Sequence, residues 1–180
     1  MKFIGTAIPG VMVIEPKIME DGRGFFFENY RKEIFAQNGI KAEFVQDNHS
    51  RSARGVVRGL HYQIEPRSQA KLVRVIRGEA FDAVVDIRKG SPTFGRYFSV
   101  LLSEQNKKMV YVPAGFAHGF CALKDDTQFL YKTTDYYSPE HERGILWNDP
   151  AIGIEWPKPD VGYTVSDRDK KYPTLKESLR

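Results

Sequence analysis

Short runs of apolar and aromatic residues follow one another along the chain, with Gly, Pro, Asn or Asp between them. Runs of this length, rich in Val, Phe and Tyr, are typical of strands rather than helices. We expect strands over residues 11–15, 25–29, 43–47, 56–63, 71–77, 80–88, 97–103, 108–112, 119–123 and 128–136. Many short strands at this spacing indicate an antiparallel sandwich or barrel.

The segment after Gly78 shows the alternation most clearly. Its apolar positions are interleaved with mostly polar ones, as Phe81, Ala83, Val85 and Ile87 alternate with Asp82, Val84, Asp86 and Arg88. This period of two predicts a strand with one apolar face and one mostly polar face. The glycine between residues 71–77 and 80–88 predicts a β-hairpin at Gly78.

Helix signals are few and short. A helix is expected over residues 31–37, capped at Asn29 or Tyr30 and ending before Gly39. Thr174 and Glu177 have the spacing of a capping box and predict a short C-terminal helix. We therefore expect one domain over residues 1–180, mainly β with short peripheral helices.

Composition and charge narrow the classes of function. A chain of 180 residues suits a single core, and its net charge of +4 comes from basic residues spread along the sequence, so no nucleic-acid surface is expected. No stretch has the length of a membrane span, and Pro9, Gly10 and Glu15 interrupt the N-terminal apolar run. Cys121 has no second cysteine to pair with. We expect a cytoplasmic protein that binds no membrane.

Two of the four histidines stand in informative patterns. His118 follows Pro113 and Gly115 with the Pro-x-Gly-x-x-His spacing of the second cupin motif, and His61 lies where cupins have their first motif. That first motif normally reads His-x-His, but here its second position is Gln63. Three converging nitrogen ligands are therefore lacking, and we expect no metal. The pattern predicts a cupin-type jelly-roll β-barrel.

Several longer blocks resemble the dTDP-4-dehydrorhamnose 3,5-epimerase family. In order they are RGFFFE (23–28), FVQDNHS (44–50), RGLHYQ (58–63), GFAHGF (115–120), FLYK (129–132), DYYSP (135–139) and ILWND (145–149). The resemblance implies a homodimeric, metal-free cupin barrel that needs no cofactor. It also implies the substrate dTDP-4-dehydro-6-deoxy-D-glucose and the product dTDP-4-dehydro-L-rhamnose, on the way to dTDP-L-rhamnose.

Epimerisation beside a ketone requires a base, an acid on the opposite face and a partner for the enolate oxygen. His61 is the natural base, because imidazole has an unperturbed pKa of about 6.5. The resemblance implies Asp169 as the carboxylate behind it, with Asp167 as an alternative. It likewise implies Tyr131 as the acid and Lys71 as the partner of the enolate oxygen.

The resemblance also implies a set of residues that bind the substrate. This set comprises Arg23, Glu28, Gln46, Asp47, Asn48, Arg58, Lys71, His118, Tyr137, Glu142 and Arg168. Arg23 and Arg58 would hold the diphosphate, and Tyr137 would stack on thymine or the sugar. Arg168 stands where the family more usually has lysine, so positive charge is kept while the contact geometry changes.

Strand geometry raises one conflict within this set. In a regular strand His61 shares a face with Gly59 and Gln63, whereas Arg58 points the other way. For Arg58 and His61 to meet one ligand, the strand must bulge or twist near Gly59, or Arg58 must serve elsewhere.

Three other functions fit parts of the pattern. One is an epimerase of a related sugar nucleotide that acts at C3 or C5 alone, which the sequence separates poorly from the double epimerase. A second is a metal-dependent cupin enzyme, disfavoured by Gln63. The third is a non-catalytic sensor of sugar nucleotides, disfavoured by the joint presence of His61, Lys71 and Tyr131.

Overall fold

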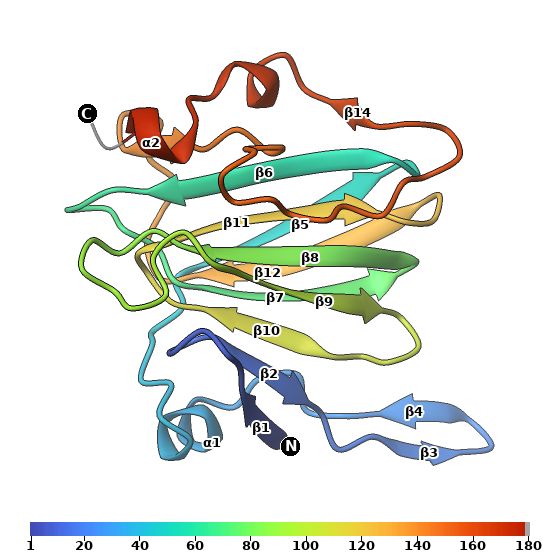
Figure 1. The fold of residues 1–180 in the computed structure, drawn as a ribbon. Coiled ribbons are helices and arrows are strands. Elements are labelled where there is room, and N and C mark those ends of the chain that lie inside the picture. The colour runs from blue at the N-terminus through green and yellow to red at the C-terminus, as the bar shows by residue number, and fades with distance from the viewer. Residues whose placement is uncertain (179–180) are drawn as a thin grey trace.

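The computed structural model describes residues 1–178, in which two six-stranded sheets face each other (Figure 1). The first sheet has the order β1 (Lys2–Gly5), β2 (Met12–Glu15), β10 (Met109–Val112), β7 (Lys71–Arg77), β12 (Thr127–Thr133) and β5 (Gln46–Ser52). The second has the order β13 (Glu142–Gly144), β6 (Val56–Gln63), β11 (Phe116–Ala122), β8 (Glu79–Asp86) and β9 (Tyr97–Ser103), with β14 (Thr164–Val165) parallel to β6. The expectation of a mainly β jelly roll is confirmed.

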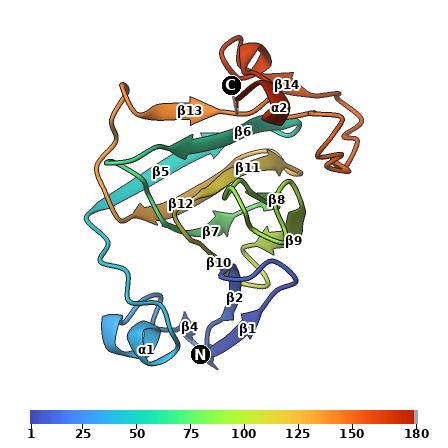
Figure 2. The same cartoon turned by 60° about the vertical axis from the view of Figure 1, so that its left-hand side comes forward.

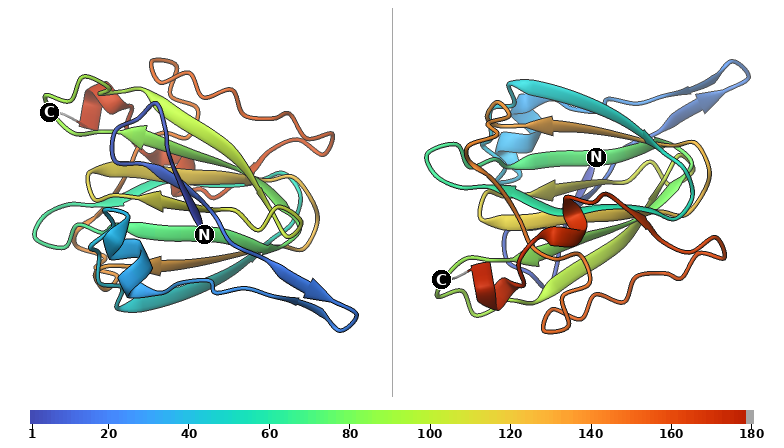
Figure 3. Two further views of the ribbon diagram at one scale, coloured as in Figure 1. Left: turned by 90° about the horizontal axis from the view of Figure 1, so that it is seen from below. Right: turned by 90° about the horizontal axis from the view of Figure 1, so that it is seen from above.

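The remaining elements lie outside the two sheets. A two-stranded hairpin of β3 (Met19–Asp21) and β4 (Gly24–Phe26) projects away from the barrel (Figure 3). Helix α1 (Lys32–Gln37) lies at the opposite end of the molecule from α2 (Leu175–Ser178), as Figure 2 shows. A short 3₁₀ helix, η1 (Asp169–Lys171), precedes α2. No helix within residues 1–178 is long and apolar enough to cross a membrane.

Apolar side chains fill the space between the sheets. Val73 and Phe129 from the first sheet meet Val84 and Phe120 from the second. The rings of Phe120 and Phe129 stack with centroids 4.3 Å apart. On one side this pair packs in the core, and on the other it forms the apolar floor of a cavity between the sheets that is otherwise lined mostly by polar side chains.

The outer face of the second sheet is covered as well. Val57 and Val85 pack against Trp156 and Leu175 of the C-terminal segment, which lies across β6 (Figure 3, right). Strand β8 is therefore covered on both faces, so the face that the sequence marked as mostly polar lies inside the protein. Asp82 and Asp86 are both 0% exposed.

The predicted hairpin at Gly78 is also wrong. β7 and β8 belong to different sheets, so the chain crosses from one sheet to the other at this point. Gly78 has φ +76°, and an added Cβ would lie 2.6 Å from Thr127 Oγ1, so only glycine fits this corner. Two strands separated by a glycine have the same sequence pattern whether they pair with each other or belong to different sheets.

Some predicted boundaries shift. The expected strand at 43–47 is instead β5, which begins at Gln46 and runs to Ser52, and the expected strand at 25–29 shrinks to β4. Strands β1, β3, β13 and β14 were not expected, because each has four residues or fewer. Helix α1 begins after Arg31 without a side-chain cap, so neither Asn29 nor Tyr30 caps it.

The C-terminal capping box is confirmed. The backbone N–H of Thr174 donates to Glu177 Oε2 at 2.8 Å, and the N–H of Glu177 donates to Thr174 Oγ1 at 3.4 Å. Asp149 Oδ2 also accepts the N–H of Leu175 at 2.6 Å, which ties the start of α2 to the segment before it.

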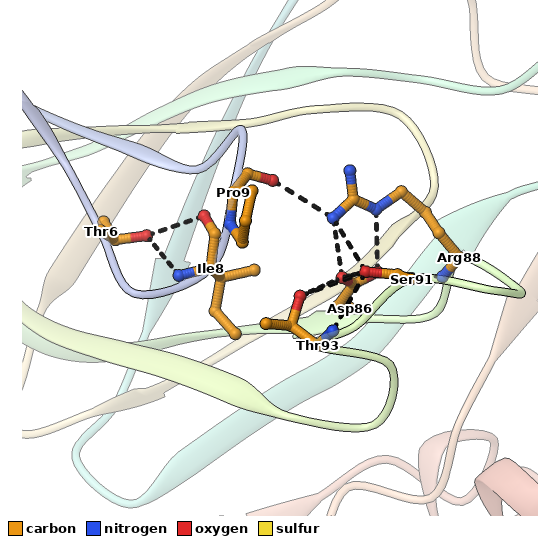
Figure 4. A network of polar contacts seen from close by, with 7 residues as sticks. All are labelled: Thr6, Ile8, Pro9, Asp86, Arg88, Ser91 and Thr93. Carbon is orange, nitrogen blue, oxygen red and sulfur yellow. Dashed lines mark hydrogen bonds and ion pairs between the residues drawn. The ribbon is translucent and has the colours of Figure 1, made fainter.

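A network around Asp86 joins two loops (Figure 4). Its carboxylate accepts hydrogen bonds from Arg88 Nε at 2.9 Å and from Ser91 Oγ and Thr93 Oγ1 at 2.6 Å each. Arg88 Nη2 also donates to the carbonyl of Pro9 at 3.2 Å. Burial alone would raise the pKa of Asp86, but these donors outweigh burial and lower that pKa strongly.

Replacing Asp86 by asparagine tests this network. Asp86→Asn removes a buried charge and leaves Arg88 without its partner, so we expect the free energy of unfolding to fall by about 3 kcal/mol. Urea unfolding at pH 7 measures it. Asp167→Asn is the matched control, because that side chain is 90% exposed, and its midpoint should not move. Equal midpoints for both variants would contradict a stabilising network.

Candidate active site

A bulge in β6 decides which side chains enter the barrel. His118 pairs with His61 and Phe120 pairs with Arg58, so β6 has one residue more than β11 over this stretch. At the bulge Gly59 has φ +144°, and an added Cβ would lie 2.6 Å from the Cα of Gly119. Because of the extra residue, the side chains of Arg58 and His61 both line one cavity. Of the alternatives that strand geometry left open, the bulge is confirmed.

His61 forms a hydrogen-bonded pair with Asp169. Its Nε2 lies 2.9 Å from Asp169 Oδ1, and Asp169 Oδ2 accepts the backbone N–H of Gly59 at 3.1 Å. The alternative carboxylate, Asp167, is exposed and pairs with Lys170 at 3.4 Å. The geometry thus selects Asp169 as the partner of His61.

Electrostatics keep Asp169 ionised beside the imidazole. Burial alone would raise the pKa of Asp169, but the hydrogen bond and charge of His61 and the N–H of Gly59 outweigh it and lower that pKa. The carboxylate engages one ring nitrogen of His61 and leaves the other for a ligand.

Tyr131 and Lys71 reach the same cavity from the opposite sheet. Tyr131 lies on β12 and Lys71 begins β7, whereas His61 lies on β6. Burial raises the pKa of Tyr131, an effect that Arg58 opposes and Glu142 reinforces. Tyr131 therefore enters any reaction as a neutral phenol.

Burial also sets the protonation of Lys71. It lowers the pKa of Lys71 to about 8, although the charges of Glu142 and Asp82 raise it in part. Lys71 Nζ donates to the carbonyl of His61 at 3.3 Å. At neutral pH it is an ammonium group facing the space between the two walls.

A second histidine–carboxylate pair lies deeper in the barrel. His118 Nε2 is 2.8 Å from Asp82 Oδ2, and both side chains are buried. Asp82 Oδ1 finds no hydrogen-bond partner among residues 1–178. Sequence reasoning did not name Asp82 as a site residue, although an aspartate at an inward position of a barrel strand was the available signal.

The outer part of the cavity is lined by polar side chains from five strands and two loops. They are Gln46, Asn48, His61, Tyr62, Gln63, Gln69, Lys71, Tyr131, Thr133, Tyr137 and Glu142. Tyr137 Oη donates to Glu142 Oε2 at 2.7 Å, and Arg168 pairs with the other oxygen of Glu142. Arg168 Nε donates to Tyr172 Oη at 2.7 Å. Tyr172 was missed by sequence reasoning, and its ring lies edge-on to His61 with centroids 5.8 Å apart.

Comparisons with known proteins cover almost the whole chain. Residues 5–177 match the family model described as dTDP-4-dehydrorhamnose 3,5-epimerase. A protein of that name from Shigella flexneri is 54% identical over 94% of this chain and 93% of its own length. The chain belongs to the dTDP-4-dehydrorhamnose 3,5-epimerase family.

Solved structures of relatives agree with the fold. A dTDP-6-deoxy-D-glucose-3,5-epimerase from Legionella pneumophila, in complex with dTDP-4-keto-L-rhamnose, has a TM-score of 0.94 and 47% identity, covering 97% of this chain and 93% of that one. A 3′-monoepimerase from Streptomyces bikiniensis, in complex with dTDP-quinovose, has a TM-score of 0.91 and 39% identity, covering 98% and 90%. The family therefore includes enzymes named for one epimerised carbon and for two.

Three residues expected to bind the substrate lie outside the cavity of this chain. Asp47 faces the outside of β5 and pairs with Lys132 at 2.8 Å, because alternate residues of a strand point to opposite faces. Arg23 is on the β3–β4 hairpin, where its side chain is 92% exposed and pairs with Asp21 at 2.6 Å. Glu28 pairs with Arg31 at 3.3 Å. For Asp47 the expectation is not met within one chain.

The histidines do not form a metal site with their neighbours. His61 and His118 each pair with a separate carboxylate, and the amide of Gln63 bonds to the backbone of the loop after β12. Within residues 1–178 no group of three or more His, Cys, Asp or Glu side chains could hold a metal ion. Metal independence stays a prediction that a chelator can test.

The depressed pKa of Lys71 predicts a pH-dependent stability. Below about pH 8 the folded protein holds a partly buried, charged ammonium, whereas the unfolded chain titrates near 10.5, so the desolvation penalty is relieved as pH rises from 8 to 10.5. Lys71→Met should therefore be more stable than the wild type at pH 7, by a margin that shrinks towards pH 10. Urea unfolding at both pH values measures the margin. Lys2→Met, at an exposed lysine, should show a flat difference, and a flat difference for Lys71→Met would refute the buried charge.

Proposed function

We propose that this protein epimerises C3 and C5 of dTDP-4-dehydro-6-deoxy-D-glucose to give dTDP-4-dehydro-L-rhamnose, in dTDP-L-rhamnose biosynthesis, with no cofactor. The observation that supports it most is the placement of His61 and Tyr131 on opposite sheets around one cavity. Inverting a carbon requires proton removal on one face of the sugar and delivery on the other.

In the first step the second ring nitrogen of His61 takes the proton from the carbon beside the C4 ketone. The C–H electron pair forms the enolate, and His61 becomes an imidazolium that the ionised Asp169 stabilises at 2.9 Å. The ammonium group of Lys71 donates a hydrogen bond to the C4 oxygen as negative charge develops there. Losing such a donor typically costs about 3 kcal/mol of transition-state stabilisation.

In the second step Tyr131 delivers its phenolic proton to the opposite face of the same carbon. The enolate is far more basic than a phenolate, so the transfer is downhill even though burial raises the pKa of Tyr131. Arg58 favours the phenolate that results. Exchange with water then returns a proton to Tyr131 and removes one from His61, and the cycle repeats at the second carbon.

The remaining cavity residues fit the nucleotide part of the substrate. Arg58 and Arg168 would bind the diphosphate through charge-assisted hydrogen bonds, and His118 would contact the sugar from the floor. Gln46 and Asn48 face inward on β5 and would read the sugar or base. Tyr137 at the mouth would stack on thymine or the sugar ring.

A single-carbon epimerase is the second candidate, supported by the similarity to the Streptomyces bikiniensis 3′-monoepimerase. Proton NMR of the product formed in heavy water separates the two. We expect deuterium at both C3 and C5; incorporation at one carbon would favour the single-carbon enzyme, and incorporation at neither would reject an epimerase.

Variants and a chelator serve as controls for that experiment. His61→Asn should incorporate no deuterium, whereas His49→Asn should match the wild type, because His49 lies outside the cavity and contacts Gln128 at 3.1 Å. Dialysis against a chelator should leave the rate unchanged, and lost activity restored by a divalent metal would revive the metal-dependent alternative.

The protein is proposed to be a cytoplasmic homodimer. The β3–β4 hairpin exposes Phe25 and Phe26 beside Arg23, an apolar surface on a projecting arm. Packed against a second copy, this arm would bury its aromatic rings and bring Arg23 and Glu28 towards the partner's cavity.

Charge placed on the arm tests this assembly. The double variant Phe25→Asp and Phe26→Asp should sediment as a single chain and lose activity, whereas the wild type sediments as two. Val161→Asp is the control, since Val161 is an exposed apolar residue distant from the arm in sequence and fold. A wild type that sediments as one chain would contradict the homodimer.

A further inference from the structure

Gln63 stands where the cupin pattern usually has a metal-binding histidine, yet its side chain is fully engaged elsewhere. It is 6% exposed, and its amide bonds to three backbone groups. Nε2 donates to the carbonyls of Arg67 at 2.6 Å and Tyr136 at 3.2 Å, and Oε1 accepts the N–H of Ser138 at 2.8 Å. These bonds leave the amide oriented in one way only, because a flipped amide would face donor to donor.

Two further glutamines hold the same loop. Gln69 Nε2 donates to the carbonyl of Asp135 at 2.7 Å, and Gln46 Oε1 accepts the N–H of Tyr137 at 3.0 Å. Each of residues 135–138 therefore has a backbone group bonded to a glutamine side chain. We call Gln46, Gln63 and Gln69 the glutamine clamp.

The loop that the clamp holds carries Tyr137. It connects β12, which ends at Thr133, with β13, which begins at Glu142, so no strand ladder fixes it at Tyr137. The clamp fixes the backbone of Tyr137, and Glu142 accepts its hydroxyl at 2.7 Å. Its ring is half-exposed at the mouth of the cavity.

We propose that the glutamine clamp is a positioning device that places Tyr137 over the sugar nucleotide, with Gln63 as its central member. This inference rests on the proposed function and deepens it, because it names what sets the fit of the substrate at the cavity mouth. Ordering the loop before binding removes an entropy cost that the ligand would otherwise meet. Gln63, which stands where the cupin pattern usually has a metal ligand, thus serves substrate binding in this chain.

Gln63→Glu tests the proposal with almost no change in shape. The new carboxylate would face the carbonyl oxygens of Arg67 and Tyr136 without a proton to donate, so the loop should be released. We expect KM to rise about 10- to 100-fold while kcat changes less than about threefold, because His61 and Tyr131 are untouched. Gln105→Glu is the matched control, since Gln105 is exposed and its side chain bonds to Glu104, away from the loop, and its KM should not change.

A double-mutant cycle shows whether Gln63 acts through Tyr137. In a Tyr137→Ala background, Gln63→Glu should raise KM no further. Additive effects on KM, or a loss of kcat at constant KM, would overturn the proposal. If Gln63→Glu fails to fold, Gln63→Met, which also removes the donors, takes its place in the same cycle.

Amide hydrogen exchange separates failure of the clamp from failure of the proposed function. Exchange at Tyr137 and Ser138 should accelerate at least 10-fold in Gln63→Glu and stay unchanged in Gln105→Glu, whatever reaction the protein catalyses. Unchanged exchange at these amides would overturn the clamp, whereas a wild type without deuterium incorporation would overturn the function alone.

Discussion

The hydrogen bond between His61 and Asp169 joins two parts of the chain on which the site depends. His61 belongs to the barrel wall, and Asp169 belongs to the C-terminal segment that covers the outer face of the second sheet. The same carboxylate accepts the N–H of Gly59 at the bulge. One buried anion therefore orients the imidazole, holds the bulge that turns Arg58 inward, and fixes the C-terminal segment to β6.

The two-sheet architecture places the His61–Asp169 pair opposite the groups with which it would act. A cavity between facing sheets presents different side chains to the two faces of a flat ligand, here His61 on one wall and Tyr131 with Lys71 on the other. Both carboxylates inside are hydrogen-bonded, since Asp169 and Asp82 each contact an imidazole nitrogen. The cationic character that remains at Lys71, Arg58 and Arg168 suits an enolate and a diphosphate.

Local sequence pattern predicted the strands well and their partners poorly. A bulge at Gly59 was among the alternatives that the sequence offered, because Arg58 and His61 cannot share a ligand on a regular strand, and the family resemblance pointed to Asp169. The corner at Gly78 could not be foreseen, since alternation reports which face is apolar and not which strand lies beside it. β5 was misplaced because its inward residues, such as Asn48, are polar where they line the cavity.

Two further features left no local signal. The role of Gln63 is set by backbone groups more than seventy residues away at Tyr136 and Ser138, contacts that only the folded chain creates. Arg23 and Glu28 matched the family in sequence, yet in the folded chain they pair with Asp21 and Arg31 outside the cavity.

Single-turnover deuterium exchange by Asp169→Asn tests the central claim most directly. If the ionised carboxylate orients His61 and stabilises its imidazolium, the rate of exchange at C5 should fall at least about 100-fold while the affinity for dTDP stays unchanged. Exchange at the wild-type rate would contradict the account, because His61 would then act as a base without the partner that the fold provides.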